Sequence, residues 1–369
     1  MKKNKIIIKT SDGNYPILIG RNLSLKLGNI LFKNFIIPSK ILLVVDKKVP
    51  KGMINKIIKS LTSKYFIFYF TSNEKNKSQF YVNKILNVLL KNNFSRSDCI
   101  ISIGGGITGD LTGYVASIFK RGINYVNVPT TLLAQVDSSI GGKTSINSTF
   151  GKNLIGTFYQ PKLVVSDISF LKSLGKREII CGYAEILKHS LILNKNFFDF
   201  LDKNINYILN LKNPFIEKAI FKSCLIKKHV VEKDFKEKGL RKLLNFGHTF
   251  GHAYEASFGY SKKLNHGEAV ILGMKSAIEF SHENKILIYK DYKKISNHIL
   301  KISKNFKIHN YFKSKKIQNL IRFMINDKKN TDNNINLILL KKIGKAEINL
   351  NFKIDKIYSF LNQILVNKI

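Results

Sequence analysis

Residues 99–119 read CIISI-GGGITGD-LTGYVASIF, and this stretch decides the fold class. The run Cys99–Ile103 predicts a buried strand, and the residues after Asp110 have the composition of a helix. Glycines at a strand-to-helix turn let the backbone approach a pyrophosphate, and the helix N-terminus supplies free N–H groups and a partial positive charge. The glycines fit the pattern GxGxxG, which is a weak signal by itself because glycine-rich turns are common.

Apolar runs of strand length recur on both sides of this stretch. They are Ile41–Val45, Tyr65–Phe70, Tyr125–Val128 and Leu163–Val165. The segment Gln79–Lys91 is amphipathic with helical spacing, and it lies between two of these runs. Strands that alternate with helix-length segments predict βαβ units and a parallel sheet. The run ILLVV at 41–45 is continuously apolar, as a strand buried on both faces of a parallel sheet should be.

After about Leu174 the pattern changes to long segments with helical spacing. The clearest are Glu178–Leu193, Pro214–Glu232, Phe246–Ala256 and Glu268–His282. A short hairpin is expected near 335–349, with Gly344 between its strands Asn336–Leu340 and Ala346–Leu350. We therefore predict an α/β domain over residues 1–174 and a mainly α-helical domain over residues 175–369.

The charge of the chain is unusual, with 62 Lys+Arg against 24 Asp+Glu and a formal net charge of +38. Such a balance raises nucleic acid or an anionic membrane as a partner. The excess is nearly all lysine, spread through a chain that is also rich in Asn and Ile and has no Trp. These residues share A/T-rich codons, so we favour compositional drift, and no nucleic-acid motif is found. We expect small anionic substrates, and neither nucleic acid nor a membrane as a partner.

The three cysteines, Cys99, Cys181 and Cys224, are too few and too dispersed for a disulfide framework. The N-terminus MKKNKIII has only a short apolar run, and no apolar stretch approaches the ~20 residues of a membrane span. We expect a soluble cytoplasmic protein.

The position of an acidic partner for the glycine turn is unusual. In a standard dinucleotide fold a carboxylate follows about 20 residues later, but Pro129, Thr130 and Thr131 occupy that place. Asp46, at the end of ILLVVD, is the better candidate. Its carboxylate would accept hydrogen bonds from ribose hydroxyls and disfavour a 2′-phosphate, which predicts NAD rather than NADP. The alternative is a solvated aspartate in a turn, and the residues leave both interpretations open.

Histidines are concentrated in one region. His248 and His252 have the i, i+4 spacing that places them on one helical face, and His266 begins another predicted helix. A catalytic zinc needs three protein ligands and an open position, and Glu185 would complete the set. The alternative is a pair of ordinary surface or core histidines. Glycines around these residues are expensive inside a helix, which favours a site that something approaches closely.

Glycine-flanked lysines suggest an anion site. Val136–Thr144 lacks the period of a helix or strand, and it places Lys143 after two glycines; Lys152 follows Gly151. Small residues expose backbone N–H groups, and lysine supplies a point charge. The run Gly-Gly-Lys-Thr resembles the end of a Walker A motif, but Asp137 stands where that motif needs glycine, so we reject a P-loop ATPase. Solvated surface lysines are the alternative.

Together these segments resemble the 3-dehydroquinate synthase family. The resemblance rests on GGGITGDLTGYVASIFKRG, VPTTLLAQVDSSIGGKTSIN, GKNLIGTFYQP, REIICGYAEILKH, GLRKLLNFGHTFGHAYE and LNHGEAV, in the family's order. It extends from residues 13–20 to the run Asp327–Lys329. It implies a Rossmann-like NAD-binding N-terminal domain, a helical metal-binding C-terminal domain, a site in the cleft between them, and a homodimer. The implied reaction closes 3-deoxy-D-arabino-heptulosonate 7-phosphate into 3-dehydroquinate, the second step of the shikimate pathway.

The resemblance also implies site residues. The ligands of Zn²⁺ or Co²⁺ would be Glu185, His248 and His266. The NAD contacts would be Asp46, Ser72, Asn73, Glu74, Lys75, Asn76, Lys77, Gly106, Ile107, Thr108, Gly109, Asp110, Thr130, Thr131, Lys143, Lys152, Phe170, Leu171, Lys172 and Ser173. The substrate contacts would be Asp137, Lys143, Asn153, Lys188, Lys227, Arg241, Asn245, His252 and a lysine of Asp327–Lys329, with Arg121 reaching the phosphate in the partner subunit's site.

The sequence departs from the family pattern at two places. Residues 175–177 read Gly-Lys-Arg where the family commonly has a proline, which should affect the domain junction more than the chemistry. Ile107 and Thr108 also vary from the commonest letters of the glycine loop, with no role that we can name.

Overall fold

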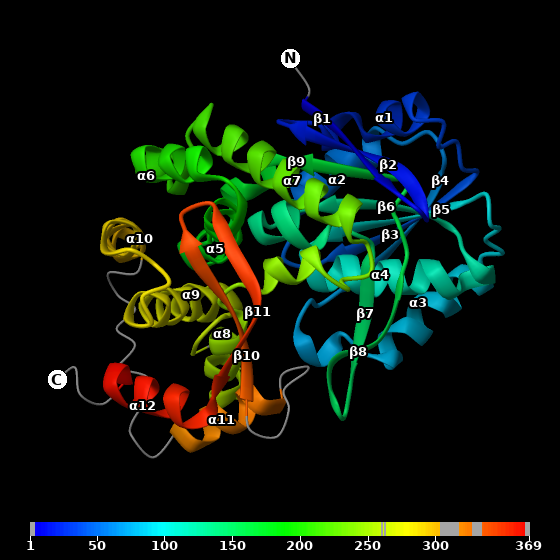
Figure 1. Ribbon diagram of the computed structural model, residues 1–369. Helices are drawn as coiled ribbons and strands as arrows, with labels where there is room; N and C mark the ends of the chain where they lie inside the picture. The colour runs from blue at the N-terminus through cyan, green and yellow to red at the C-terminus, as the bar shows by residue number, and fades with distance from the viewer. Residues whose placement is uncertain (1–3, 260, 262, 303–316, 327–333, 366–369) are drawn as a thin grey trace. The chain divides into compact units, whose positions relative to one another are not determined.

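The structure is a computed structural model that describes residues 4–259, 261, 263–302, 317–326 and 334–365 (Figure 1). The chain divides into two compact units, Met1–Ile179 with Asn210–Phe235, and Ile180–Leu209 with Lys236–Ile369. The predicted domains are consecutive, whereas here the chain returns to the first unit for residues 210–235. Helical spacing predicted the helix in that segment, but it carries no information on which core the helix packs against.

The described part of the first unit contains a seven-stranded sheet with the order β1-β2-β9-β6-β5-β3-β4. Its strands are β1 (Asn4–Thr10), β2 (Gly13–Gly20), β3 (Lys40–Asp46), β4 (Lys64–Phe70), β5 (Cys99–Gly104), β6 (Asn124–Pro129) and β9 (Leu163–Asp167). All neighbours pair in parallel except β1 and β2, which form an antiparallel hairpin. The predicted strands and the parallel sheet are confirmed.

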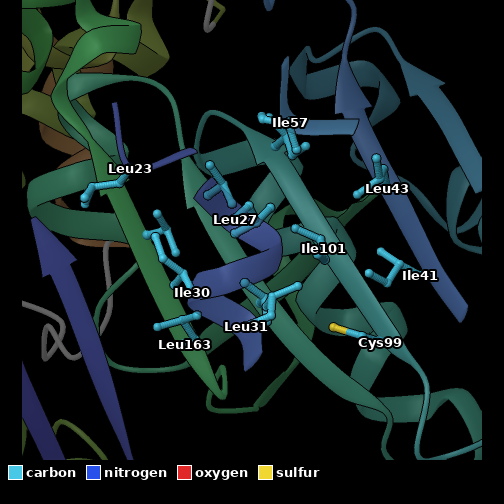
Figure 2. Packing of buried hydrophobic residues seen from close by; sticks show 14 of the residues in the cluster. Leu23, Leu27, Ile30, Leu31, Ile41, Leu43, Ile57, Cys99, Ile101 and Leu163 are labelled. Carbon is cyan, nitrogen blue, oxygen red and sulfur yellow. The ribbon is translucent and has the colours of Figure 1, made fainter. Parts of the chain in front are cut away.

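Helices cover both faces of this sheet. They are α1 (Leu27–Lys33), α2 (Lys51–Lys59), α3 (Gln79–Lys91) and α4 (Gly106–Ile118), and α7 (Phe215–Lys233) also belongs to this unit. Successive residues of β3 point to opposite faces. Ile41 and Leu43 join the core that includes α1 and α2 (Figure 2), and Leu42 and Val44 join the core that includes α3 and α4. This two-sided burial explains the continuously apolar run.

A second hairpin in the first unit was not predicted. It consists of β7 (Lys143–Ser148) and β8 (Gly151–Phe158), which pair antiparallel. The preceding residues Ala134–Ser138 form a π-helical turn, η4. Most of β8 is exposed, so its sequence shows no apolar alternation. The absence of a regular period in Val136–Thr144 reflects this change from turn to strand.

The second unit is mainly helical. Its helices are α5 (Lys176–Leu193, which begins in the first unit), α6 (Lys195–Leu209), α8 (His248–Ser257), α9 (His266–Glu283), α10 (Tyr289–Ile302), α11 (Ile317–Asn326) and α12 (Ile354–Leu365). The expected hairpin is present as β10 (Asn334–Lys342) and β11 (Lys345–Lys353). The predicted fold class, an α/β part and a mainly helical part, is therefore confirmed. No described helix is long and apolar enough to cross a membrane.

Candidate functional site

The glycine turn of the first unit joins β5 to α4. Gly104 ends β5, and Gly106 is the first residue of α4. A Cβ atom on Gly106 would lie 2.9 Å from the Ser138 hydroxyl oxygen, and one on Gly105 would lie 3.2 Å from a methyl group of Thr131. A side chain would therefore have little room at either position. The turn leads into the N-terminus of α4, whose first backbone N–H groups have no partner within the helix and suit a pyrophosphate.

Asp46 lies next to this turn at the carboxyl edge of the sheet. It ends β3, and the register Val45↔Ile103 places it beside Gly104 of the neighbouring strand β5. The strand after β3, β4, lies on one side of it, and the next strand, β5, lies on the other, so the order in which strands are added to the sheet reverses at β3. In open parallel sheets, ligands bind at such a switch point. Burial raises the pKa of Asp46, partly opposed by a hydrogen bond from the backbone of Lys48.

The sheet explains why the candidate acidic residue, Asp46, precedes the glycine turn in the sequence. In this sheet the strand beside the glycine turn precedes it in the chain, because β3 pairs with β5. Thr130 and Thr131 follow β6 on the other side of the turn, and the Thr130 N–H donates to the Gly104 carbonyl at 2.9 Å. The acidic residue therefore comes from upstream, while the position about 20 residues downstream carries threonines.

The other predicted cofactor contacts lie at the same edge of the sheet. Residues 72–77 follow β4 and include a short 3-10 turn, Glu74–Asn76. Residues 170–173 lie in a 3-10 segment after β9. Phe170 and Leu171 are fully buried, whereas Lys172 and Ser173 are exposed. Thr108 is buried as well.

Lys77 links this edge to the hairpin. Its ammonium lies 2.6 Å from a carboxylate oxygen of Asp110 and 3.2 Å from the hydroxyl oxygen of Ser145, and it also donates to the side-chain oxygen of Asn153. Burial raises the pKa of Asp110, and Lys77 opposes that rise. Two residues predicted for NAD and one predicted for substrate thus contact each other.

A second set of contacts joins the same segments. The Asn147 side-chain amide donates to a carboxylate oxygen of Glu74 at 2.8 Å, and the Lys152 ammonium lies 3.5 Å from the other oxygen. Asn153 has a left-handed backbone with φ of 58°, a conformation that asparagine tolerates well. Lys143 is exposed at the first position of β7. Lys143, Lys152 and Asn153 therefore all lie on the two paired strands of one hairpin.

Asp137 and Lys227 form a partly buried pair within the first unit. The Lys227 ammonium donates to the backbone carbonyl of Asp137 at 2.6 Å and to its carboxylate. Lys227 is 5% exposed, so its charge is largely removed from water and depends on this partner. Asp137 lies on the π-helical turn η4, a type of irregularity that is frequent at functional sites.

Three side chains from three helices converge in the second unit. Glu185 lies on α5, His248 is the first residue of α8, and His266 is the first residue of α9. One ligand atom from each lies within 4.8 Å of those of the other two. Two imidazole nitrogens and a carboxylate are a donor set of catalytic zinc sites, and the same set suits cobalt. The structure brings together the three residues predicted as metal ligands.

The carboxylate of Glu185 indicates that a cation fits here. Its side chain is 2% exposed, and neither oxygen accepts a hydrogen bond of good geometry from the described residues, although Lys188 forms an ion pair with Oε2. His248 Nε2 faces Oε1 at 3.9 Å. A buried carboxylate with lone pairs left without donors is costly. A divalent cation between these atoms would satisfy them.

The pKa values of the two histidines shift in opposite directions. Burial lowers the pKa of His248 well below its usual value, and the charge of Lys188 and the neighbouring His252 and His266 act in the same direction. His248 is therefore the neutral imidazole that binds metals. Burial also lowers the pKa of His266, but the hydrogen bond and charge of Glu255 outweigh it, so the net shift is upward.

Glycines allow the helices that carry these ligands to approach closely. A Cβ atom on Gly273 of α9 would lie 2.1 Å from the Gly247 carbonyl oxygen beside α8, and one on Gly251 of α8 would lie 2.9 Å from the Ala269 carbonyl oxygen. A Cβ atom on Gly267 would lie 2.2 Å from the Cα of Cys181 on α5. This explains glycines inside helices, where they otherwise cost about 1 kcal/mol each.

The substitution Gly267→Ala is expected to weaken metal binding by at least about tenfold. The added methyl group meets the backbone of α5, so α9 must move away and His266 must leave Glu185; overpacking of this kind costs about 1–3 kcal/mol. The measurement is the Zn²⁺ dissociation constant of the metal-stripped protein. Gly52→Ala on α2 is the control, because nothing lies within 4 Å of its Cβ position. Equal affinities in the two variants would contradict the close-packing argument.

A series of hydrogen-bonded side chains connects α5 to α10 and α6. Tyr183 is fully buried, and its hydroxyl lies 3.0 Å from His298 Nε2 on α10. His298 Nδ1 lies 2.9 Å from Asp202 on α6, whose carboxylate also pairs with Lys301. An ionised Asp202 accepts from Nδ1–H, which leaves Nε2 to accept from Tyr183. The series ties the helix that carries Glu185 and Lys188 to two neighbouring helices.

The remaining predicted residues of the second unit lie as follows. Lys188 is 2% exposed and pairs with Glu185. The His252 ring centroid lies 4.9 Å from that of His248. Arg241 is buried in a 3-10 segment, Leu240–Asn245, and the Asn245 side-chain amide donates to Glu237 at 2.7 Å. The predicted lysine of the 327–329 run lies outside the described residues.

Arg121 of the first unit lies in an unusual backbone segment. It follows α4, is exposed, and has φ of 63°, directly after Lys120 with φ of 48°. Consecutive left-handed residues other than glycine are uncommon, and such strain concentrates at functional positions.

Sequence reasoning missed Glu255, which contacts His266 in the structure. A signal was present, because Glu255 lies seven residues after His248, or about two helical turns, and therefore on the same face of α8. Only the fold shows that this face meets the start of α9.

Two family models match consecutive parts of the chain. The model described as 3-dehydroquinate synthase N-terminal matches residues 67–181, and the one described as 3-dehydroquinate synthase C-terminal matches residues 182–330. The chain is 53% identical to a 3-dehydroquinate synthase of Pelagibacter ubique, over 98% of both chains. It is 40% identical to a 3-dehydroquinate synthase of Thermodesulfovibrio yellowstonii, over 97% of this chain and 99% of the other.

Solved structures share the fold over nearly the whole chain. A 2-deoxy-scyllo-inosose synthase in complex with carbaglucose-6-phosphate, NAD⁺ and Co²⁺ has a TM-score of 0.86 and 24% identity, and covers 98% of this chain and 99% of its own. A 2-epi-5-epi-valiolone synthase of Streptomyces hygroscopicus with NAD⁺ and Zn²⁺ bound has a TM-score of 0.83 and 22% identity, with 96% and 98% covered.

Proposed function

This chain belongs to the 3-dehydroquinate synthase family, and on that premise we propose that it converts 3-deoxy-D-arabino-heptulosonate 7-phosphate into 3-dehydroquinate and phosphate. The observation that carries the proposal is the 53% identity to a 3-dehydroquinate synthase over 98% of both chains. The convergence of Glu185, His248 and His266 supports it, because the ligands expected for such an enzyme lie together.

NAD is the proposed dinucleotide of the first unit. It supplies a reversible hydride acceptor, so it is regenerated in each turnover. The N-terminus of α4 would hold its pyrophosphate, and Asp46, beside the turn at the switch point, would accept hydrogen bonds from ribose hydroxyls. Two solved structures of the same fold contain NAD⁺, which agrees with this assignment.

Zn²⁺ or Co²⁺ is the proposed metal of the second unit. A divalent cation supplies a Lewis acid that lowers the pKa of a substrate hydroxyl. Glu185, His248 and His266 would hold it, and the fit rests on the buried carboxylate oxygens of Glu185 and on a neutral His248. The ring of His252 lies beside that of His248, and in this proposal His252 would relay protons.

Basic side chains would bind the two anionic groups of the substrate. We assign Lys143, Asn153 and Arg121 to the phosphate, and Lys227 and Arg241 to the carboxylate, with Arg241 as a bidentate fork. Lys188, Asn245 and Asp137 would complete the substrate contacts. Lys227 already lies against Asp137 and Asn153 against Lys77, so these side chains are held in place before the substrate binds. Such preorganisation lowers the cost of positioning.

One assay tests the function. The purified chain receives 3-deoxy-D-arabino-heptulosonate 7-phosphate with Zn²⁺ and NAD at a concentration far below the substrate. Phosphate and 3-dehydroquinate should form in equal amounts, each exceeding the NAD present many times over. Product limited to the amount of NAD would indicate a net dehydrogenase and would overturn the proposal.

Homodimer formation belongs to the same proposal, because Arg121 is expected to act in the partner's site. We predict that a mixture of Arg121→Ala and His248→Ala chains, unfolded and refolded together, regains activity that neither variant has by itself. A mixed dimer contains one site with an intact metal group and an intact Arg121. Random pairing gives about a quarter of the wild-type activity at equal amounts.

The control for the mixing experiment is the pair Lys143→Ala and His248→Ala. Both residues are expected from the same chain in the same site, so each site of a mixed dimer lacks one of them and no activity should return. Arg121→Ala mixed with wild type gives the reference. If the mixture with Arg121→Ala also fails to recover, like the mixture with Lys143→Ala, Arg121 belongs to its own subunit's site.

A further inference from the structure

Glu255 is a buried carboxylate that no part of the proposed reaction uses. It lies near the end of α8, and its side chain is 10% exposed. One of its oxygens, Oε2, lies 3.1 Å from Nδ1 of His266. A buried carboxylate needs compensation by hydrogen bonds or charge, and Nδ1 of His266 provides a hydrogen bond.

The contact decides which nitrogen of His266 is available. An ionised carboxylate only accepts hydrogen bonds, so the proton of the imidazole lies on Nδ1. The lone pair is then on Nε2, which is the nitrogen left to bind a metal. A carboxylate behind a metal-binding histidine fixes its tautomer, orients its ring and makes it a stronger ligand.

His266 depends on such a contact more than the other two ligands do. Its side chain is 36% exposed, compared with 11% for His248 and 2% for Glu185. His248 Nδ1 faces the backbone carbonyl of Phe246 at 3.4 Å, so its orientation comes from the main chain. His266 is the first residue of α9, and the hydrogen-bond contact of its ring is with the Glu255 side chain rather than with the main chain.

We propose that Glu255 is a positioning residue that holds His266 in the rotamer and tautomer required to bind a divalent transition-metal ion. This inference rests on the proposed function through the metal group of Glu185, His248 and His266. It goes further because it assigns part of the metal affinity to a residue outside the ligand set. Glu255 acts through His266 and touches neither substrate nor NAD.

The test is the metal affinity of the full-length protein after removal of metal, with Zn²⁺ and Co²⁺ as probes. Glu255→Ala is expected to raise the dissociation constant for both ions by about 10- to 100-fold. Glu255→Gln keeps an oxygen that accepts from Nδ1–H, so it should recover most of the affinity. The absorption bands of bound Co²⁺ should change in Glu255→Ala and stay close to wild type in Glu255→Gln, because the bands report ligand geometry.

Glu279→Gln is the matched control. Glu279 is a buried glutamate on α9, 13 residues after His266 and 7% exposed, and its substitution should leave the metal affinity unchanged. The thermal unfolding midpoint of each metal-free variant shows whether it is folded. If Glu255→Ala does not fold, the metal affinity of Glu255→Gln is compared with that of the wild type instead.

The outcomes separate this inference from the proposed function. Wild-type affinity in Glu255→Ala would overturn the inference and leave the function in place. Equal losses in the Ala and Gln variants would also overturn it. They would show that the negative charge of Glu255 alone raises the metal affinity, without any need to orient His266. Tight metal binding that depends on Glu255, in a protein that releases no phosphate from the heptulosonate phosphate, would support the inference and contradict the function. A wild-type chain that binds neither ion would overturn both.

Discussion

Replacing His248 by alanine is expected to abolish metal binding and to lower the rate of phosphate release by at least about a thousandfold, with the fold intact. The substitution removes a neutral imidazole that lies 3.9 Å from Glu185. Two ligands then remain, where a catalytic metal needs three. A thousandfold loss corresponds to about 4 kcal/mol of transition-state stabilisation, the several kcal/mol that a Lewis acid supplies.

The measurements are the bound metal per chain, the circular dichroism spectrum and the initial rate of phosphate release. His229→Ala is the matched control, because His229 is exposed on α7, and it should keep full metal content and activity. Full activity of the metal-stripped wild-type protein would rule out the metal assignment. So would an active His248→Ala variant.

Replacing Lys143 by alanine is expected to lower kcat/KM by about 10²- to 10³-fold, which is the range for loss of one well-placed charge at a reacting group. Lys143 begins β7 directly after two glycines with positive φ, Gly141 at 101° and Gly142 at 65°. A Cβ atom on Gly142 would lie 2.4 Å from the Gln160 side chain. The loop is therefore shaped by glycine, and this shape fixes the backbone position from which the Lys143 side chain extends.

The comparison that decides this prediction is with lysines of the same exposure. Lys59 at the end of α2 is exposed and lies outside the carboxyl edge of the sheet, so Lys59→Ala should change kcat/KM by less than about twofold, as a distant surface substitution does. Equal small losses in both variants would return Lys143 to the class of solvated surface lysines. A loss confined to KM for NAD would instead assign Lys143 to the cofactor.

Much of this protein was predictable from local patterns in its sequence. Strands such as Ile41–Val45 are readable because burial on both faces of a parallel sheet demands continuous apolar residues. The helices that carry His248 and His266 are readable because burial on one side demands a period near 3.6 residues. The three metal ligands were predicted from histidine spacing and from resemblance to a family. In the structure, one ligand atom of each lies within 4.8 Å of those of the other two.

Other features were decided by tertiary structure. The return of α7 to the first unit and the hairpin β7–β8 depend on which surfaces meet, and no local period records that. The contact between Glu255 and His266 likewise requires α8 and α9 to pack through Gly247, Gly251 and Gly273. A sequence therefore determines which residues can be helical, extended or ligating, through propensity and pattern. The pairing of distant side chains is decided by close packing, because only the assembled core determines which helix faces come into contact.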